Sequence, residues 1–354
     1  MKQKILISTG GSGGHIIPAL ILYKHLSSEF DLVISSDLRG LKYIDKNFSK
    51  VEIINTPKLD NIFLLPFNFL KILFFTIKSI ILLKKQKVNK LISTGGYMSL
   101  PLCLSARLLG LDIYLVEPNF VLGRANKFFL NFCRKIFCYS DKIKNFPDNF
   151  KNKIIIIKPL VRKEFYQKSE NIKKNEKFNL LIVGGSQGAS FFDNNFKSAI
   201  LKISKKKPLK ILHQTSLKNL DNLKSFYNKN NIENYIFSFE NEFAKILHQS
   251  DLCITRAGAS SLAELSILNI PFIAIPLPSA KDNHQFENAI YYEKNDCCWI
   301  LNQNSSDKEI EDNLSKIIED RNEYEKKKKN LKNLNYENTW NNVNEKLLNN
   351  INEN

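Results

Sequence analysis

The sequence predicts an α/β protein with two Rossmann-like, doubly wound domains facing a cleft. Short apolar runs alternate with longer mixed segments along most of the chain, as expected when buried parallel strands are separated by helices. This pattern occurs twice, and each half has a strand that runs into a glycine-rich turn, ILISTGGSGGH at 5–15 and LLIVGGSQGAS at 180–190. With 354 residues and 43% hydrophobic content, the chain is longer than one core usually supports.

The apolar runs give the expected order of the strands. We expect strands at 4–9, 30–35, 51–55, 90–94, 112–117 and 135–140 in the first half, and at 179–185, 209–214, 234–239, 252–258 and 271–276 in the second. KIIIIKPLVRKEF at 153–165 is interpreted as the crossing between the domains. The expected organisation is an N-terminal domain over 1–160, a second domain over 161–335 and a C-terminal helical tail over 336–354. From about residue 305 the Lys-, Glu- and Asn-rich sequence predicts solvated helices.

The chain is strongly basic, with 52 Lys and Arg against 35 Asp and Glu and a formal net charge of +17. Such a charge favours an anionic partner, which is a phosphorylated ligand, an anionic membrane surface or nucleic acid. We expect no nucleic-acid partner, because that interpretation rests on charge alone and no recognised basic-aromatic module occurs. Residues 1–20 have no signal-peptide pattern, and a reducing cytoplasm fits cysteines that form no CxxC pair or metal-ligand spacing. These cysteines lie at 103, 133, 138, 253, 297 and 298.

The first glycine-rich turn indicates an anion site. Glycines after a strand let the backbone approach a ligand closely, and a helix that begins near His15 directs free N–H groups into the turn. The dinucleotide fingerprint fails because its third glycine falls on Ile16, although Asp37 after the next strand is consistent with it. No Lys-Ser or Lys-Thr follows, which excludes a nucleotide-triphosphate P-loop. A tight turn with His15 as a helix cap is the alternative.

A second turn repeats the first. LISTGG at 91–96 nearly duplicates ILISTGG at 5–11, and Tyr97 follows it. Two such turns at strand ends of one domain would line the same edge of the sheet, which suits a ligand with two phosphates. We therefore take Gly95, Gly96 and Tyr97 as candidate residues for the acceptor of a reaction.

The second half contains a longer pattern, SDLCITRAGASSLAELSILNIPFIAIPLPSAKDNHQFENA at 250–289. It predicts a strand, an Arg-Ala-Gly turn, a helix that opens at Ala259, a buried strand and a polar loop. Glu264 would then lie in the first turns of the helix, where its carboxylate can accept hydrogen bonds from two adjacent ribose hydroxyls. Alternatively, Glu264 only balances the helix dipole.

The most apolar window lies at 61–87. Its length raises the question of a membrane-spanning helix, but Pro66 interrupts the early part and an inserted helix would carry lysines inside the hydrocarbon. We predict instead a helix that lies in the membrane interface, with lysines near the phosphate headgroups. A helix packed on its own sheet is the alternative. The candidate apolar residues are Phe69, Leu73, Phe74, Ile77 and Ile81, and the candidate lysines are Lys71 and Lys78.

Eight segments, taken together, resemble the MurG family of bacterial cell-wall N-acetylglucosaminyltransferases. They are GGSGGHIIPAL, STGGYMSLP, VEPNFVLGRANK, KPLVR, VGGSQGAS, HQTS, TRAGASSLAEL and PLPSAKDNHQFENA, in the family's order over about residues 3–300. The resemblance implies the GT-B fold and transfer of N-acetylglucosamine from UDP-N-acetylglucosamine to the muramyl 4-hydroxyl of undecaprenyl-diphospho-N-acetylmuramoyl-pentapeptide. It also implies inversion at the anomeric carbon, a role in peptidoglycan synthesis, and peripheral attachment to the cytoplasmic face of the inner membrane.

The resemblance also implies donor-binding positions, mainly in the second domain. They are Ser12, Gly13, Gly14, Asn119, Arg162, Ser186, Ala259, Ser260, Ser261, Leu262, Ala263, Glu264 and Gln285, with the uracil contact near Glu240. The chain departs from the family at Val116, Pro118 and Phe120, where His, Gln and Gly are common, but it keeps Glu117 and Asn119.

The implied mechanism is a direct displacement. His15 is the candidate base for the acceptor hydroxyl, and Arg162 with the N–H groups around Ser186 would offset charge on the leaving diphosphate. No Asp-x-Asp pair occurs there, so we expect no cofactor and no obligatory metal. Two other enzymes are alternatives on this fold: a UDP-N-acetylglucosamine epimerase, which needs no acceptor, and a glycolipid transferase acting on diacylglycerol.

Overall fold

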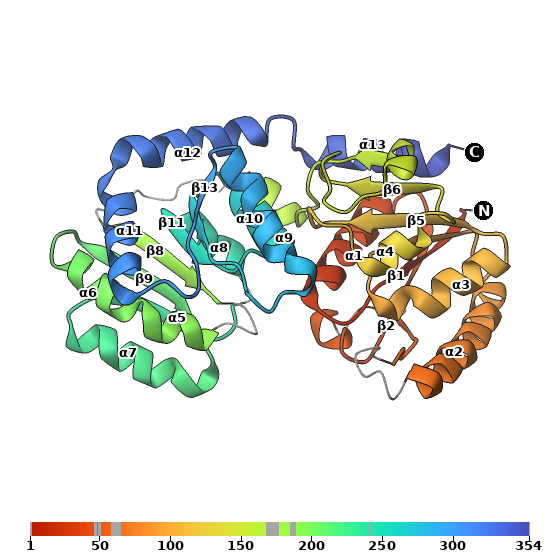
Figure 1. Ribbon diagram of the computed structural model, residues 1–354, viewed down its shortest axis with the longest axis horizontal. Coiled ribbons are helices and arrows are strands. Elements are labelled where there is room, and N and C mark those ends of the chain that lie inside the picture. Colours follow the sequence, from red (N-terminus) through yellow and green to blue (C-terminus); the bar gives the residue numbers. More distant parts are fainter. Residues whose placement is uncertain are drawn as a thin grey trace. The chain divides into compact units, whose positions relative to one another are not determined.

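The computed structural model describes residues 2–45, 48, 51–57, 65–167, 177–184, 189–240 and 242–353. The chain divides into two compact units (Figure 1). Unit 1 comprises Met1–Val161 together with Thr339–Asn354, and unit 2 comprises Arg162–Asn338. The last sixteen residues of the chain therefore belong with the amino-terminal half, a grouping that the sequence does not reveal.

Unit 1 is built on a seven-stranded parallel sheet in the order β3-β2-β1-β4-β5-β6-β7. Its first six strands are the six that the apolar runs predict. The seventh was not expected, because its isoleucines fall in the segment interpreted as the crossing. The strands are β1 (Lys4–Ser8), β2 (Asp31–Ser36), β3 (Val51–Ile53), β4 (Lys90–Ser93), β5 (Asp112–Glu117), β6 (Lys135–Cys138) and β7 (Ile154–Ile156).

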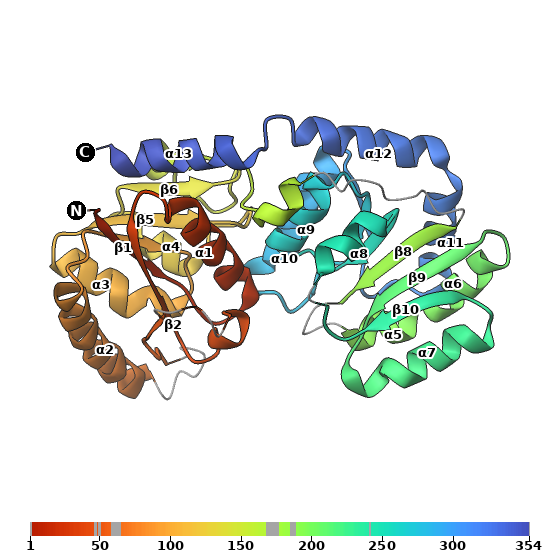
Figure 2. The same ribbon diagram turned by 180° about the vertical axis from the view of Figure 1, so that it is seen from behind.

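Helices cover both faces of this sheet. They are α1 (Gly13–Leu26), α2 (Leu65–Lys85), α3 (Leu100–Leu108), α4 (Arg124–Phe129) and α13 (Trp340–Asn352), with 3₁₀ turns η1 (Leu41–Tyr43), η3 (Tyr97–Ser99) and η4 (Asp148–Lys153). The C-terminal helix α13 lies beside α1 (Figure 2). The His25 ring stacks on Trp340 with centroids 3.6 Å apart, and the buried Lys90 ammonium donates to the Ile351 carbonyl at the end of α13. A cation at a helix C-terminus is favourable, so this end of the chain is fixed to unit 1.

Unit 2 has a six-stranded parallel sheet in the order β10-β9-β8-β11-β12-β13. The strands are β8 (Phe178–Val183), β9 (Leu209–Gln214), β10 (Glu233–Phe237), β11 (Leu252–Thr255), β12 (Phe272–Ala274) and β13 (Cys298–Ile300). The first five were expected. The sixth was not, although CCWIL at 297–301 is an apolar run.

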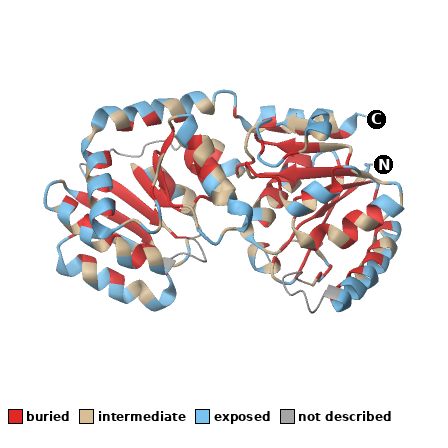
Figure 3. Ribbon diagram, in the orientation of Figure 1, coloured by how far each residue is buried: buried red, intermediate tan, exposed pale blue. Residues whose placement is uncertain are grey.

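The helices of unit 2 are α5 (Ala189–Asn195), α6 (Lys197–Ser204), α7 (Leu220–Lys229), α8 (Phe243–Gln249), α9 (Ala259–Ile267), α10 (His284–Lys294), α11 (Asp307–Glu319) and α12 (Arg321–Leu334), with 3₁₀ turns η5 (Lys163–Tyr166), η6 (Leu217–Asn219) and η7 (Lys281–Asn283). Figure 3 shows that most of the strands of both sheets are buried, whereas many helices are exposed along one side. Helices α11 to α13 follow this rule, since each buries an apolar stripe. The predicted tail is therefore solvated on one face only.

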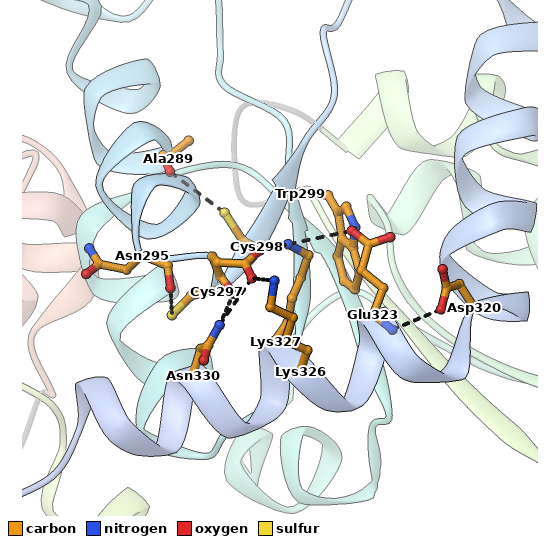
Figure 4. A network of polar contacts seen from close by, with 11 residues as sticks. Ala289, Asn295, Cys297, Cys298, Trp299, Asp320, Glu323, Lys326, Lys327 and Asn330 are labelled. Carbon is orange, nitrogen blue, oxygen red and sulfur yellow. Dashed lines mark hydrogen bonds and ion pairs between the residues drawn. The ribbon is translucent and has the colours of Figure 1, made fainter.

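A polar network holds α12 on unit 2 (Figure 4). The Lys327 ammonium donates to Asp296 Oδ1 at 2.7 Å, and the Trp299 indole donates to Glu323 Oε1 at 2.8 Å. Lys327 also lies 4.9 Å from the centre of the Trp299 ring. Lys326 and Lys327 are paired with Asp296, and Lys327 also with Glu323, so the network serves packing.

Candidate functional site

Four strand ends bring the predicted residues of unit 1 to one edge of its sheet. In the parallel register Ser8 of β1 pairs with Ser35 of β2 on one side and with Ser93 of β4 on the other. The Thr94 hydroxyl donates to the Thr9 hydroxyl at 2.9 Å. The two STGG turns are therefore neighbours, as the sequence predicts.

The first turn is organised by Asp37. Gly11 has φ +76°, a left-handed conformation that favours glycine. The fully buried Asp37 carboxylate accepts from Gly11 N at 2.8 Å and from Gly40 N at 2.9 Å, and it pairs with Arg39. The Asp37 carboxylate therefore stabilises the turn and does not face a ribose site. Ile16, where the dinucleotide fingerprint fails, is buried in α1.

The second turn is just as constrained. Gly95 and Gly96 have φ +83° and +79°. A Cβ on Gly96 would lie 2.3 Å from Met98 Sδ, and one on Gly11 would lie 2.4 Å from Met98 Cε. The buried Met98 side chain thus packs against both turns. Tyr97 begins η3 directly after the second turn.

Helix α1 begins two residues before the predicted position, with Ser12 as its N-cap and Gly13 and Gly14 in its first turn. His15 therefore projects from the first turn of the helix, and its Nδ1 lies 2.8 Å from the Thr94 carbonyl oxygen. A carbonyl can only accept, so Nδ1 carries the proton and Nε2 the lone pair of the neutral ring. A Cβ on Gly96 would lie 3.3 Å from Nε2, which places this nitrogen beside the second turn.

Glu117 at the end of β5 holds the loop that contains Asn119. Its Oε1 accepts from the Asn119 backbone and side-chain amides at 3.2 and 3.1 Å, and its Oε2 accepts from Gly123 N at 2.7 Å and Asn126 Nδ2 at 3.0 Å. The Asn126 amide also lies where a Cβ on Gly95 would meet it. With four donors, the buried Glu117 acts as a positioning group.

The positions that depart from the family lie largely inside the fold. Val116 is fully buried in β5, and its carbonyl accepts from Asn126. Phe120 is also buried. At Val116 and Phe120 the chain therefore differs from the family in its core beside the loop.

Two of the charged donor-site candidates, Arg162 and Glu264, lie together in unit 2. Arg162 Nε donates to Glu264 Oε1 at 2.9 Å, and the guanidinium lies 4.6 Å from the Phe165 ring centre. Helix α9 begins at Ala259, as the sequence predicts, so Ser260, Ser261, Leu262 and Ala263 lead to Glu264 in its second turn. Burial raises the pKa of Glu264, an effect that the charge and hydrogen bond of Arg162 oppose. The pair leaves Oε2 of Glu264 for a ligand.

The polar loop after β12 is tied to the start of α9. Gln285 Oε1 accepts from Leu277 N at 3.0 Å, and the buried Asn288 donates to the Ala257 carbonyl at 3.1 Å. Arg256 of the same turn lies 5.0 Å from the ring centres of both Phe191 and Phe192. Neither Asn288 nor Arg256 was singled out from the sequence, although both belong to the segment at 250–289.

The HQTS segment forms a buried network. Asp193 Oδ2 accepts from the Thr215 hydroxyl at 2.7 Å and from Asn219 Nδ2 at 2.8 Å, and His213 Nε2 lies 3.3 Å from Oδ1. Burial favours the neutral acid, but these hydrogen bonds outweigh it and lower the pKa of Asp193. The network fixes the end of β9 to α5.

Ser186 and Glu240 are the remaining candidates for the donor site. Ser186 lies outside the described residues. The Glu240 carboxylate accepts from the Tyr235 hydroxyl at 2.7 Å, so it faces β10, the strand that precedes it. The neighbouring Phe239 is exposed.

Helix α2 keeps most of its large apolar side chains on its exposed side. Its buried stripe mixes the polar Asn68, Thr76 and Ser79 with the apolar Ile72 and Leu83. The Ser105 hydroxyl of α3 donates to the Thr76 carbonyl at 2.8 Å. The five predicted apolar residues, Phe69, Leu73, Phe74, Ile77 and Ile81, are between 52% and 67% exposed. Lys71 and Lys78 are exposed as well. None of the five therefore packs on the sheet. Pro66–Lys85 is also long and apolar enough to cross a membrane by length and composition.

Comparisons with known proteins agree with this architecture. The N-terminal domain model of glycosyltransferase family 28 matches residues 5–138, and the C-terminal domain model matches residues 179–340. A UDP-N-acetylglucosamine–N-acetylmuramyl-(pentapeptide) pyrophosphoryl-undecaprenol N-acetylglucosamine transferase of Pelagibacter ubique is 52% identical, over 100% of both chains. The Rickettsia felis transferase of the same name is 35% identical over 89% of this chain and 91% of its own. The crystal structure of Acinetobacter baumannii MurG has a TM-score of 0.77 at 23% identity and covers 98% of each chain.

The two parallel α/β units have the GT-B fold, and together with the family models and relatives they define a glycosyltransferase that uses a UDP-sugar. The chain belongs to glycosyltransferase family 28 and, within it, to the MurG family of N-acetylglucosaminyltransferases.

Proposed function

We propose that this chain transfers N-acetylglucosamine from UDP-N-acetylglucosamine to the muramyl 4-hydroxyl of undecaprenyl-diphospho-N-acetylmuramoyl-pentapeptide. The reaction converts lipid I to lipid II in peptidoglycan synthesis. The observation that carries this proposal is the 52% identity, over the whole of both chains, to a transferase named for that reaction. The two adjacent glycine turns of unit 1 suit the diphosphate of such an acceptor.

The proposed mechanism is an inverting displacement in one step. His15 Nε2 takes the proton of the 4-hydroxyl, whose oxygen bonds to the anomeric carbon while the bond from that carbon to the UDP oxygen breaks. The contact of Nδ1 with Thr94 O supports this role, because it leaves the lone pair on Nε2. UDP departs with the electron pair.

The donor is assigned to unit 2. Glu264 Oε2 accepts from the ribose, and the N–H groups at the start of α9 face the diphosphate. Arg162 offsets the charge that grows on the leaving group. Gln285 and the segment at Glu240 complete the donor site through the loops that they hold. Ser12, Gly13, Gly14, Asn119 and Ser186 are proposed as further donor contacts from the family resemblance.

We assign no obligatory metal or cofactor to the reaction, because Arg162 and the α9 N-terminus already supply positive charge at the proposed diphosphate position. Turnover measured in EDTA should therefore equal turnover measured with added Mg²⁺. A loss of about tenfold or more in EDTA that Mg²⁺ restores would contradict this, since tenfold corresponds to ~1.4 kcal/mol of barrier.

Peripheral attachment to the cytoplasmic face of the inner membrane is proposed through α2. Its exposed phenylalanines, leucines and isoleucines would enter the headgroup boundary while Lys71 and Lys78 meet anionic phosphates. We prefer this to a spanning helix because the opposite stripe of α2 is packed on α3, where the Ser105 hydroxyl donates to the Thr76 carbonyl. An interfacial position also suits an acceptor whose prenyl chain stays in the bilayer.

The decisive experiment is transfer of radiolabel from UDP-N-acetylglucosamine to a synthetic muramyl-diphospho-prenol, with mass analysis of the product. The expected product carries one added N-acetylglucosamine. An epimerase would change the donor with no acceptor present, and a glycolipid transferase would label diacylglycerol instead. Either result would overturn the proposal.

A further inference from the structure

Arg39 joins the two glycine turns of unit 1. It follows β2, two residues after Asp37, and its Nη2 pairs with Asp37 Oδ2. Asp37 in turn holds Gly11 of the first turn. The centre of the guanidinium lies 4.9 Å from the centre of the ring of Tyr97, which follows the second turn. The Arg39 guanidinium thus contacts Asp37, which holds the first turn, and Tyr97, which follows the second.

The orientation of this guanidinium is fixed on two sides. Asp37 is fully buried and has no freedom to follow the arginine, because its other oxygen is held by Gly11 N and Gly40 N. The face of the Tyr97 ring contacts the guanidinium from a second direction. A rigidly held arginine loses little conformational entropy when it binds a ligand.

Arg39 keeps donors for a ligand. Its side chain is 35% exposed, and within the described part of the chain its guanidinium makes no hydrogen bond beyond the one to Asp37. The remaining N–H groups of the guanidinium can therefore donate to a ligand oxygen at this edge of the sheet.

We propose that Arg39 binds the diphosphate of the acceptor, and that Asp37 and Tyr97 are the positioning residues that hold its guanidinium beside the two glycine turns. The inference rests on the proposed function for the identity of the acceptor. Arginine presents planar, paired donors that match phosphate oxygens, which lysine does not. The backbone N–H groups of the turns and the paired donors of Arg39 together bind a ligand with two phosphates.

The test compares two short-chain acceptors, a prenyl-diphosphate muramyl-pentapeptide and its monophosphate analogue. Arg39→Met should raise the KM for the diphosphate acceptor by roughly tenfold to a hundredfold, the range for loss of one hydrogen bond to a charged group. The KM for UDP-N-acetylglucosamine and the KM for the monophosphate acceptor should change much less. Equal losses on both acceptors, or no loss on either, would overturn the assignment.

Arg107→Met is the matched control. Arg107 also stacks on an aromatic ring, 5.1 Å from the centre of Phe132, but it lies in the last turn of α3, far along the helix from the second glycine turn. Its acceptor KM should equal that of the wild type. If Arg39→Met shows no cooperative thermal transition, Arg39→Lys decides, and it must still lose more with the diphosphate acceptor than with the monophosphate.

The two proposals fail in different ways. A wild-type chain that labels neither acceptor refutes the proposed function. In that case calorimetric titration with the diphosphate acceptor still tests Arg39, and equal affinity of the wild type and Arg39→Met overturns the inference. A wild-type chain that transfers normally while Arg39→Met keeps the wild-type acceptor KM refutes the inference alone.

Discussion

Replacing Glu264 by alanine tests the donor site most directly. Glu264 Oε1 is occupied by Arg162 Nε at 2.9 Å, which leaves Oε2 for the ribose. One charge-assisted hydrogen bond contributes about 1.5–3 kcal/mol, so the dissociation constant for UDP should rise roughly 10- to 150-fold. Isothermal titration with UDP measures this directly, and the donor KM should rise in parallel.

Glu164→Ala provides the control for this experiment. Glu164 lies 4.0 Å from the same Arg162 Nε, but its side chain is 43% exposed and it is not on α9. Its loss should leave UDP affinity unchanged. Wild-type affinity in Glu264→Ala, or an equal loss in both variants, would refute the assignment of Glu264 to the ribose.

The proposed role of Glu264 predicts that donor binding depends on pH. Burial raises the pKa of Glu264 from its ordinary value of 4.5, and Arg162 opposes this without cancelling it. For a carboxyl whose pKa is raised by folding, the stability contribution is present below the unfolded pKa and is lost as pH rises through the folded one. Donor binding has the opposite sign because it needs the carboxylate, so UDP affinity should fall on acidification through the raised pKa. Glu264→Gln should abolish this acid limb.

The remaining predictions concern the base and the membrane face. His15→Ala should lower turnover about 100-fold or more, because loss of a general base slows proton transfer. Its UDP affinity should stay near that of the wild type. Near-normal turnover in single-turnover assays would mean that His15 only forms part of the helix start. Replacing Phe74, Ile77 and Ile81 together by serine should weaken sedimentation with anionic vesicles, since each exposed side chain contributes ~1 kcal/mol or more on burial. Activity should then fall more on a long-chain acceptor in vesicles than on a short soluble one, whereas Tyr336→Ser, an exposed aromatic of unit 2, should change neither. Equal losses on both acceptors would place this face outside the membrane contact.

The sequence alone determined the features that depend on neighbours along the chain. Eleven strands stood out because buried parallel strands need continuous apolar runs, and the start of α9 followed from its Arg-Ala-Gly turn. The two STGG turns were placed at one edge because carboxyl ends of parallel strands meet there, which the Ser8–Ser93 register confirms. Residues with local chemistry, such as His15 and Glu264, were recognisable for the same reason.

Tertiary structure decided what depends on distant partners. The sequence left Asp37 compatible with a ribose, but its carboxylate is buried and accepts hydrogen bonds from Gly11 and Gly40. The contact of Arg39 with Tyr97, 58 residues later in the chain, is visible only in the tertiary structure. The strand β7 was missed because its isoleucines fall in the segment interpreted as the crossing, and β13 is identified as a strand only by its pairing with β12. The amphipathic pattern of α2 fitted either a membrane face or a packed helix, since both require one apolar side. The packing of α2 on α3, with the Ser105 hydroxyl donating to the Thr76 carbonyl, leaves its large apolar side exposed.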